Sequence, residues 1–87
     1  MAEVHLPTTL LPLFQGLPRH LEIEAETVSD AIARLDEQWP GIRDRLCESS
    51  SSLRPHINVY VDRERAQLHT ELDARSRIDV IAAISGG

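Results

Sequence analysis

The stretch IDVIAAISGG, which spans residues 78–87, decides how the rest of the chain is arranged. Every residue from 78 to 84 is apolar except Asp79. A short, continuous apolar run of this kind predicts a strand that is buried on both faces. We therefore expect residues 78–84 to form a central strand of a sheet.

Two further segments have the residue pattern of strands. Residues 57–61, INVYV, are rich in β-branched and aromatic side chains and form the strongest strand signal in the chain. Residues 20–24, HLEIE, alternate polar and apolar side chains, as expected for a half-buried strand. The alternation in 57–61 places Asn58 and Tyr60 on one face and the three aliphatic residues on the other, so only one of these two sets meets a covering helix.

The remaining strand signals are weaker. Residues 4–6, VHL, alternate briefly, and an apolar connection from 8 to 18 leads from them to strand 20–24. Prolines in and beside this connection exclude a regular helix there, so strand, connection and strand predict a β-hairpin. Residues 66–69 follow a polar turn and predict a short edge strand.

The segment that begins at Thr27 predicts the main helix. Thr27 is a suitable N-cap, and Asp30 three residues later gives the start of a capping box. The Pro-Gly pair at 40–41 stops the helix, a short turn is expected at 42–46, and the serine run 49–52 predicts a loop. The apolar stripe of the helix consists of Val28, Ala31, Ile32, Leu35 and Trp39.

This order of elements favours a single sheet. A central final strand is buried best when it pairs parallel with the first strand and the helix covers one face. The arrangement is the β-grasp (ubiquitin-like) architecture, an α+β fold in which a mixed sheet packs on one main helix. We predict a β-grasp domain over residues 1–84 and a flexible Ser-Gly-Gly tail over residues 85–87, because glycine-rich ends do not pack.

Composition restricts the classes of function. A chain of 87 residues fits one domain and has little room for a deep catalytic cleft. Its net charge of −5 argues against nucleic acids and anionic membranes as partners, and favours a partner with a basic docking patch. The single cysteine excludes an intramolecular disulfide. The single cysteine, together with the lack of a signal peptide or membrane-spanning pattern, predicts a cytoplasmic protein.

Several motifs occur in the order and spacing of one known family. The motif stretches are Leu6-Pro7-Thr8, Trp39-Pro40-Gly41-Ile42, Ile57–Asp62 and Ile84-Ser85-Gly86-Gly87. Together they resemble the MoaD/ThiS group of ubiquitin-like sulfur carrier proteins, and the resemblance spans essentially the whole chain. The chain departs from the family pattern at residues 76–77 and 82–83, so the resemblance assigns no particular pathway.

The resemblance implies a carrier rather than an enzyme. The carboxylate of Gly87 would be adenylated by a ThiF/MoeB-like activating enzyme, which uses ATP and Mg²⁺, and would then be converted to a thiocarboxylate. Ser85 and Gly86 would thread the tail into that enzyme, because a chain without large side chains passes a narrow channel. A second partner, a biosynthetic enzyme, would accept the sulfur for molybdopterin, thiazole, cysteine or thiolated tRNA.

Two other functions are compatible with the sequence. A protein modifier would join Gly87 to lysines of other proteins, whereas a simple interaction module would use the tail for no chemistry. Tyr60 and Phe14 are candidate docking residues for a partner. Cys47 is expected as a small buried residue, and the scattered histidines lack zinc-ligand spacing, so no metal site and no bound cofactor are expected.

Overall fold

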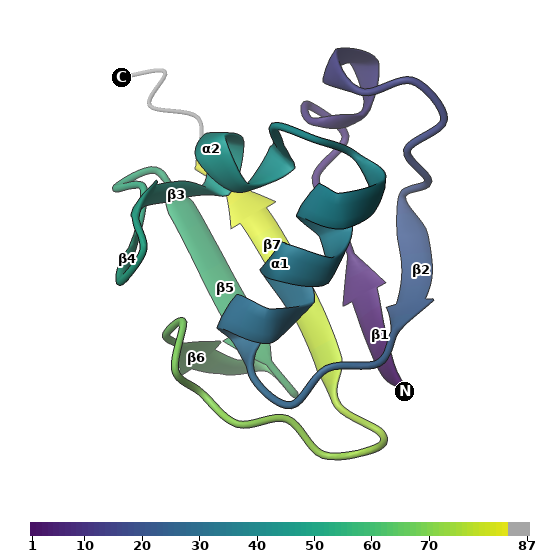
Figure 1. Cartoon of the computed structure of the whole chain (residues 1–87). Helices are drawn as coiled ribbons and strands as arrows, with labels where there is room; N and C mark the ends of the chain where they lie inside the picture. Colours follow the sequence, from purple (N-terminus) through teal and green to yellow (C-terminus); the bar gives the residue numbers. More distant parts are fainter. Residues whose placement is uncertain (84–87) are drawn as a thin grey trace.

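The computed structural model describes residues 1–83, which form a β-grasp fold (Figure 1). A five-stranded mixed sheet in the order β2-β1-β7-β5-β6 packs one face against the main helix α1. The predicted α+β fold class is confirmed. In chain order the elements are β1 (Ala2–His5), η1 (Leu11–Leu13), β2 (His20–Ile23), α1 (Val28–Gln38), α2 (Ile42–Leu46), β3 (Cys47–Ser49), β4 (Ser52–Leu53), β5 (Ile57–Val61), β6 (Glu64–Ala66) and β7 (Arg77–Ala82).

The final strand β7 lies at the centre of the sheet, as its apolar run predicts. It pairs parallel with β1, where Val4 is opposite Ile78, and antiparallel with β5, where Val59 is opposite Val80. Since β1 and β7 run in the same direction, their C-terminal ends lie beside the N-terminal ends of β2 and β5 (Figure 1). We call this end of the sheet, where the chain passes Ala83, the tail end.

Burial in β7 differs from the prediction that residues 78–84 are covered on both faces. Ile78 and Val80 are buried, but Arg77 is exposed and Ile81 is 48% exposed. Helix α1 lies on one face of the sheet, and the other face turns the intervening side chains of β7 toward solvent. The prediction of two buried faces is wrong, because an apolar run does not reveal whether anything covers its second face.

The N-terminus of α1 is capped as predicted. Thr27 Oγ1 accepts a hydrogen bond from the backbone N–H of Asp30 at 3.1 Å. The Asp30 carboxylate accepts from the N–H of Glu26 at 3.1 Å instead of from that of Thr27, so the capping box is displaced by one residue. Trp39, predicted as the last residue of the stripe, is the partly buried C-cap. The buried stripe consists of Val28, Ala31, Ile32 and Leu35.

A tight corner joins α1 to α2. Gly41 has a φ of +101°, a conformation that favours glycine, so the predicted helix stop is confirmed. Asp36 Oδ1 accepts hydrogen bonds from the N–H groups of Gly41 at 3.0 Å and Arg43 at 3.1 Å, which satisfies donors at the start of α2. The corner places Ile42 and Leu46, both 0% exposed, in the core.

The β5–β6 hairpin turns on Asp62 and Arg63, which have φ values of 50° and 72°. Positive φ at both central residues matches the twist of the flanking strands. Asp62 Oδ1 accepts from the N–H of Arg77 at 2.9 Å, and the N–H of Asp62 donates to the Arg77 carbonyl at 2.8 Å. The turn therefore has two central residues, and the edge strand is Glu64–Ala66 rather than the predicted residues 66–69.

The serine run belongs to a small second sheet rather than to the predicted loop. Strands β3 and β4 pair antiparallel, with Cys47 opposite Leu53 and Ser49 opposite Ser52. The hydroxyls of Ser49 and Ser52 lie 2.9 Å apart, and Ser49 Oγ also accepts from the N–H of Ser51 at 3.3 Å. Local side-chain hydrogen bonds of this kind support a tight hairpin whose polar composition is typical of a loop.

Candidate functional site at the tail end of the sheet

The chain leaves the sheet at Ala83. Its backbone N–H donates to the carbonyl oxygen of His56 at 2.7 Å, which ties the end of β7 to the start of β5. The predicted site residues Ser85, Gly86 and Gly87 lie outside the described residues, so their roles stay predictions. What the structure supplies is the surface from which the tail departs.

The uncovered face of the sheet carries a row of polar side chains. The register places Tyr60 opposite Asp79, Asp79 opposite His5, and His5 opposite His20. The two imidazole centroids are 4.2 Å apart, with their planes inclined by 51°. The Arg77 guanidinium donates to the Asp79 carboxylate at 3.0 to 3.2 Å, and this hydrogen bonding raises the pKa of Arg77.

Two hollows border the residues from which the tail departs. A hollow of about 470 Å³ lies on the uncovered face, between the β1–β2 connection and the end of β7, and both Arg19 and Ala82 line it. A smaller hollow of about 290 Å³ also borders Ala82, and Ala83 as well, and is lined mainly by apolar residues that include Leu13 and Ile57. The surface around the start of the tail is therefore recessed on both sides.

Comparison with known proteins places this arrangement in a family. The ThiS family model matches residues 9–87, a range that contains the main helix, strands β2 to β7 and the terminal Gly-Gly. The chain belongs to the ThiS family. The predicted relationship to the MoaD/ThiS group is therefore confirmed, and the match extends to Gly87.

Individual relatives of this ThiS-family chain agree with the assignment. The sulfur carrier protein CysO of Mycobacterium tuberculosis is 28% identical over 90 residues, which cover 97% of this chain and 96% of that protein. A chain from the Amycolatopsis orientalis BexX/CysO complex superposes with a TM-score of 0.87 at 27% identity, covering 100% of both chains. SAMP1 from Haloferax volcanii superposes with a TM-score of 0.76 at 26% identity, covering 99% of this chain and 98% of that one.

Tyr60, a predicted docking residue, lies on the uncovered face of the sheet. It is half-buried between the β6 residue Arg65 and the β7 residue Asp79, which are its partners in the strand register. Ile57, Val59 and Val61 point into the core, so the predicted division of this strand into two faces is confirmed. The docking role of Tyr60 stays a prediction for this ThiS-family protein.

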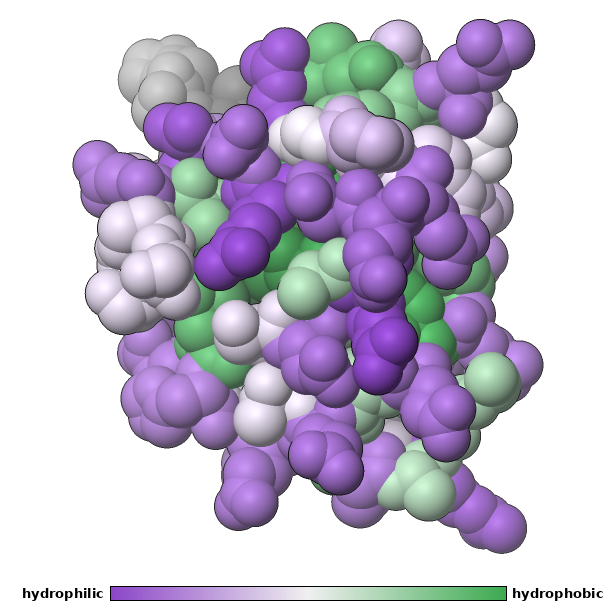
Figure 2. Space-filling model, in the orientation of Figure 1, coloured by the Kyte–Doolittle hydropathy of each residue, from purple (hydrophilic) through white to green (hydrophobic). Residues whose placement is uncertain are grey.

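Phe14, the other predicted docking residue, lies in the connection that carries η1. It packs against the core with its ring beside Gly41, while Leu10 and Leu17 on either side of it are buried. The neighbouring Leu13 is 50% exposed, and Figure 2 shows hydrophobic residues at the top of the molecule, where η1 lies. The connection thus closes the core, and its exposed apolar side chain is Leu13 more than Phe14.

Cys47 is buried at the start of β3, as expected for a small apolar residue. Burial raises the pKa of its thiol, and the positive charges of Arg43 and Arg54 only partly oppose this effect. The thiol is therefore protonated near neutral pH. A nucleophilic or redox role would require the opposite shift.

This pKa shift predicts a pH dependence of stability. Because the folded state holds the thiol proton more tightly than the unfolded state, the contribution is complete below the unfolded pKa of about 8.5 and is lost as pH rises above it. We expect the free energy of unfolding, measured by urea titration, to decrease as pH rises above about 8.5. Cys47→Ala is expected to show a smaller decrease, and an identical decrease in the variant would contradict the assignment.

Within residues 1–83, no group of three or more His, Cys, Asp or Glu side chains is arranged to hold a metal ion. None of the helices in the same range has the length and apolarity to cross a bilayer. Two acidic side chains on the uncovered face contact basic ones, since Asp79 pairs with Arg77 and Glu3 with His5.

Proposed function

We propose that this protein is a sulfur carrier whose reactive group is the terminal carboxylate of Gly87. The observation that carries the proposal is the ThiS family match, which runs through the Gly-Gly end of the chain. The similarity to sulfur carrier proteins named CysO over nearly the full length of both chains supports it. The protein is then a co-substrate of other enzymes and not itself an enzyme.

The proposed chemistry begins with activation of a poor electrophile. A Gly87 carboxylate oxygen attacks the α-phosphorus of ATP, held with Mg²⁺ by a ThiF/MoeB-like enzyme, and pyrophosphate leaves. A sulfur nucleophile then displaces AMP from the acyl adenylate. Hydrosulfide gives the thiocarboxylate directly, whereas a persulfide gives an acyl disulfide from which a thiol releases it. The activating enzyme must exclude water, because the acyl adenylate hydrolyses.

In the proposed role, the domain of residues 1–83 docks on the partner and the residues after Ala83 reach its nucleotide site. Four residues follow Ala83, and a fully extended chain of four residues spans at most about 14 Å. A partner can therefore contact the uncovered sheet face around Tyr60 while the tail enters its nucleotide site. Ser85 and Gly86 would occupy the channel, where large side chains would obstruct passage.

Intact-mass spectrometry of the protein isolated from its native cells tests the proposal. Replacement of one carboxylate oxygen by sulfur raises the mass by about 16 Da, and this shift should be absent from a variant that lacks Gly87. An unmodified terminus under all growth conditions would favour the interaction module instead. If the shift of about 16 Da is observed, trapping the thiocarboxylate form in a complex would identify the enzyme that accepts the sulfur.

A second candidate function is a protein modifier, favoured by the similarity to SAMP1, a small archaeal modifier protein. In that case Gly87 would form isopeptide bonds with lysines of other proteins. All nine basic residues here are arginine, so conjugates could not grow into chains through side chains of this protein. Adducts on other proteins, instead of a shift of about 16 Da, would support the modifier.

A further inference from the structure

Three adjoining hollows surround Ala82 and Ala83, which we call the tail root. The two already described, of about 470 Å³ and about 290 Å³, border the tail root directly. A third hollow of about 430 Å³ shares Arg45 and His56 with the smaller of these two, and His56 also accepts the hydrogen bond from Ala83. Whatever protein receives the tail must therefore approach this surface.

The charge of this surface is opposite to that of the whole chain. Four of the nine arginines line the three hollows. The fourteen acidic residues all lie within residues 1–83, but only Asp44 and Asp79 line these hollows. Asp79 is paired with Arg77. The other three arginines, Arg19, Arg45 and Arg54, form what we call the arginine collar, and within residues 1–83 no carboxylate lies within 4.0 Å of their guanidinium nitrogens.

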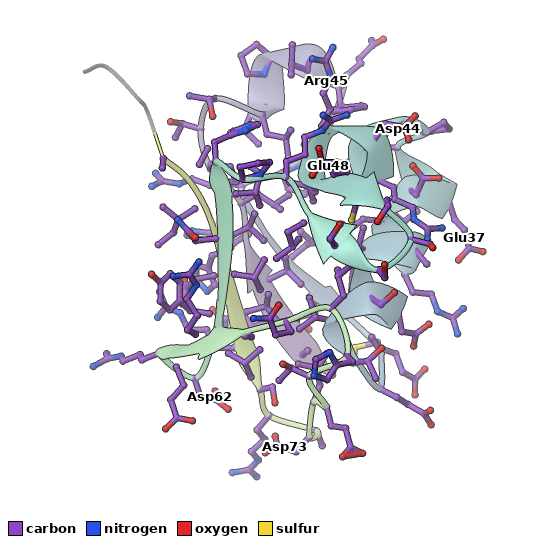
Figure 3. All side chains as sticks on the ribbon, turned by 90° about the vertical axis from the view of Figure 1, so that its left-hand side faces the viewer. Glu37, Asp44, Arg45, Glu48, Asp62 and Asp73 are labelled. Carbon is purple, nitrogen blue, oxygen red and sulfur yellow. The ribbon has the colours of Figure 1, made fainter. Side chains whose placement is uncertain are left out.

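Topology brings the arginine collar together from three distant segments. Arg19 precedes β2, Arg45 lies in α2, and Arg54 follows β4, where its Nε donates to the carbonyl oxygen of Asp44 at 2.7 Å. That hydrogen bond holds the Arg54 side chain beside α2. Asp44 and Glu48 lie near Arg45 and reduce the local positive charge without forming ion pairs with it (Figure 3).

The opposite end of the molecule has an acidic hollow, although Arg63 in the β5–β6 turn and Arg75 before β7 also lie at this end. A hollow of about 620 Å³ at the start of β1 is lined by Glu24, Glu26, Asp30 and Asp73, and among the described residues Arg34 is its only arginine. Arg34 in turn lies 3.8 Å from Asp30. Figure 3 shows Asp62 and Asp73 at the end of the molecule opposite to Arg45. The net charge of −5 therefore conceals a charge separation along the strands.

We infer that the arginine collar recognises an acidic protein surface that rims the channel into which the tail is inserted. This inference rests on the proposed function, since it concerns the partner that receives Gly87. A charge separation orients an approaching protein, and complementary potentials raise the association rate while like charges oppose it. This inference differs from the expectation, drawn from net charge alone, of a partner with a basic docking patch.

An acidic protein fits the arginine collar better than RNA does. A nucleic acid presents regularly spaced phosphates and requires a continuous basic stripe. Here the three arginines occupy one end of a domain whose opposite end is acidic, so a longer polyanion would be repelled beyond a few contacts. A localised acidic rim contacts the collar without reaching the acidic end.

Binding of a model anion tests the inference without any partner enzyme. Hexaglutamate is titrated into the isotope-labelled full chain, and amide chemical shifts are followed at about 20 mM and about 200 mM salt. We expect the largest shifts around the arginine collar, with apparent affinity reduced on the order of tenfold at the higher salt. Equal shifts at the opposite end, or tighter binding of an RNA hexamer at the collar, would overturn the inference.

Charge-reversal variants connect this surface to the reaction. Arg45→Glu/Arg54→Glu is compared with the matched control Arg63→Glu/Arg75→Glu, which makes the same charge change at the opposite end of the sheet. In pyrophosphate exchange with the ThiF/MoeB-type enzyme of the source organism, we expect the collar variant to raise KM about tenfold and the control less than about twofold. Equal KM values for the two variants would overturn the inference while the proposed function stands. Absence of pyrophosphate exchange by the unaltered protein would refute the proposed function. The hexaglutamate titration would still test whether the arginine collar binds an acidic partner.

Discussion

Deleting Gly87 is expected to abolish pyrophosphate exchange with the activating enzyme and to leave the unfolding transition of the domain unchanged. Removing one residue shortens an extended chain by about 3.5 Å. Reacting atoms must approach to about 3 to 3.5 Å, and misplacement by about 1 Å already costs on the order of a hundredfold in rate. The carboxylate of Gly86 would therefore end short of the α-phosphate, and exchange should fall by at least about a thousandfold.

The matched control for this deletion retains tail length. Ser85→Ala changes a tail residue but keeps the terminal carboxylate at the same distance from Ala83, so exchange should stay within a few-fold of the unaltered protein. Gly87→Ala keeps the length but adds a Cβ beside the reacting carboxylate, and should lose most of the activity. Full exchange by the deletion variant would refute the proposal that Gly87 is the adenylated residue.

Thermal unfolding should not distinguish these tail variants from the unaltered protein. The most C-terminal backbone hydrogen bond in the described part of the chain is that of Ala83, whose N–H donates to His56. The buried core of residues 1–83 is complete without the substituted positions, since its last member is Val80. A loss of exchange without a change in Tm would therefore locate the defect in chemistry rather than in folding.

The fold could be predicted in outline because its main elements have clear local patterns. The helical stripe with its Thr27 cap, the Pro-Gly stop and the INVYV strand each specify one element. The final strand is more apolar than the others, which indicates that it lies at the centre of the sheet. A central position beside the first strand in turn predicts the parallel pairing of β7 with β1. What the pattern could not reveal is the open second face, since Ile81 is apolar and yet half-exposed.

The candidate site could be predicted only where it is local in sequence. The Gly-Gly end is a contiguous motif, and the ThiS family match includes it. The His5–His20 contact depends on the register of β1 and β2, which the long connection between them leaves unspecified. The arginine collar combines three segments, so net charge alone could not indicate the local charge of the surface at the tail root.

The second large effect is expected at Leu35, the last residue of the buried stripe of α1. Leu35 is 1% exposed, and Leu35→Ala removes core contacts that the neighbouring backbone cannot fully replace. Large-to-small changes of this type cost about 2 to 5 kcal/mol, a large part of the total of about 5 to 15 kcal/mol for a domain. Urea unfolding followed by the fluorescence of Trp39, the only tryptophan, measures the loss.

Arg34→Ala is the matched control on the exposed face of the same helix. Its side chain forms only surface ion pairs, at 3.8 Å to Asp30 and 3.9 Å to Glu37 within the described residues, and such pairs contribute little to stability. The free energy of unfolding should therefore change by less than about 0.5 kcal/mol. A comparable loss in both variants would contradict burial as the cause, because alanine has a higher helix propensity than leucine or arginine and propensity cannot account for a loss.

Leu35→Ala also tests whether the folded body and the tail have separate tasks. The variant retains the whole tail, so at temperatures where it is folded its exchange rate should stay within a few-fold of the unaltered protein. Deletion of Gly87 should give the reverse combination, with normal stability and no exchange. If the folded Leu35→Ala variant lost exchange as completely as the deletion variant does, activation would depend on the internal packing of the domain. The domain would then do more than dock on the partner and deliver Gly87.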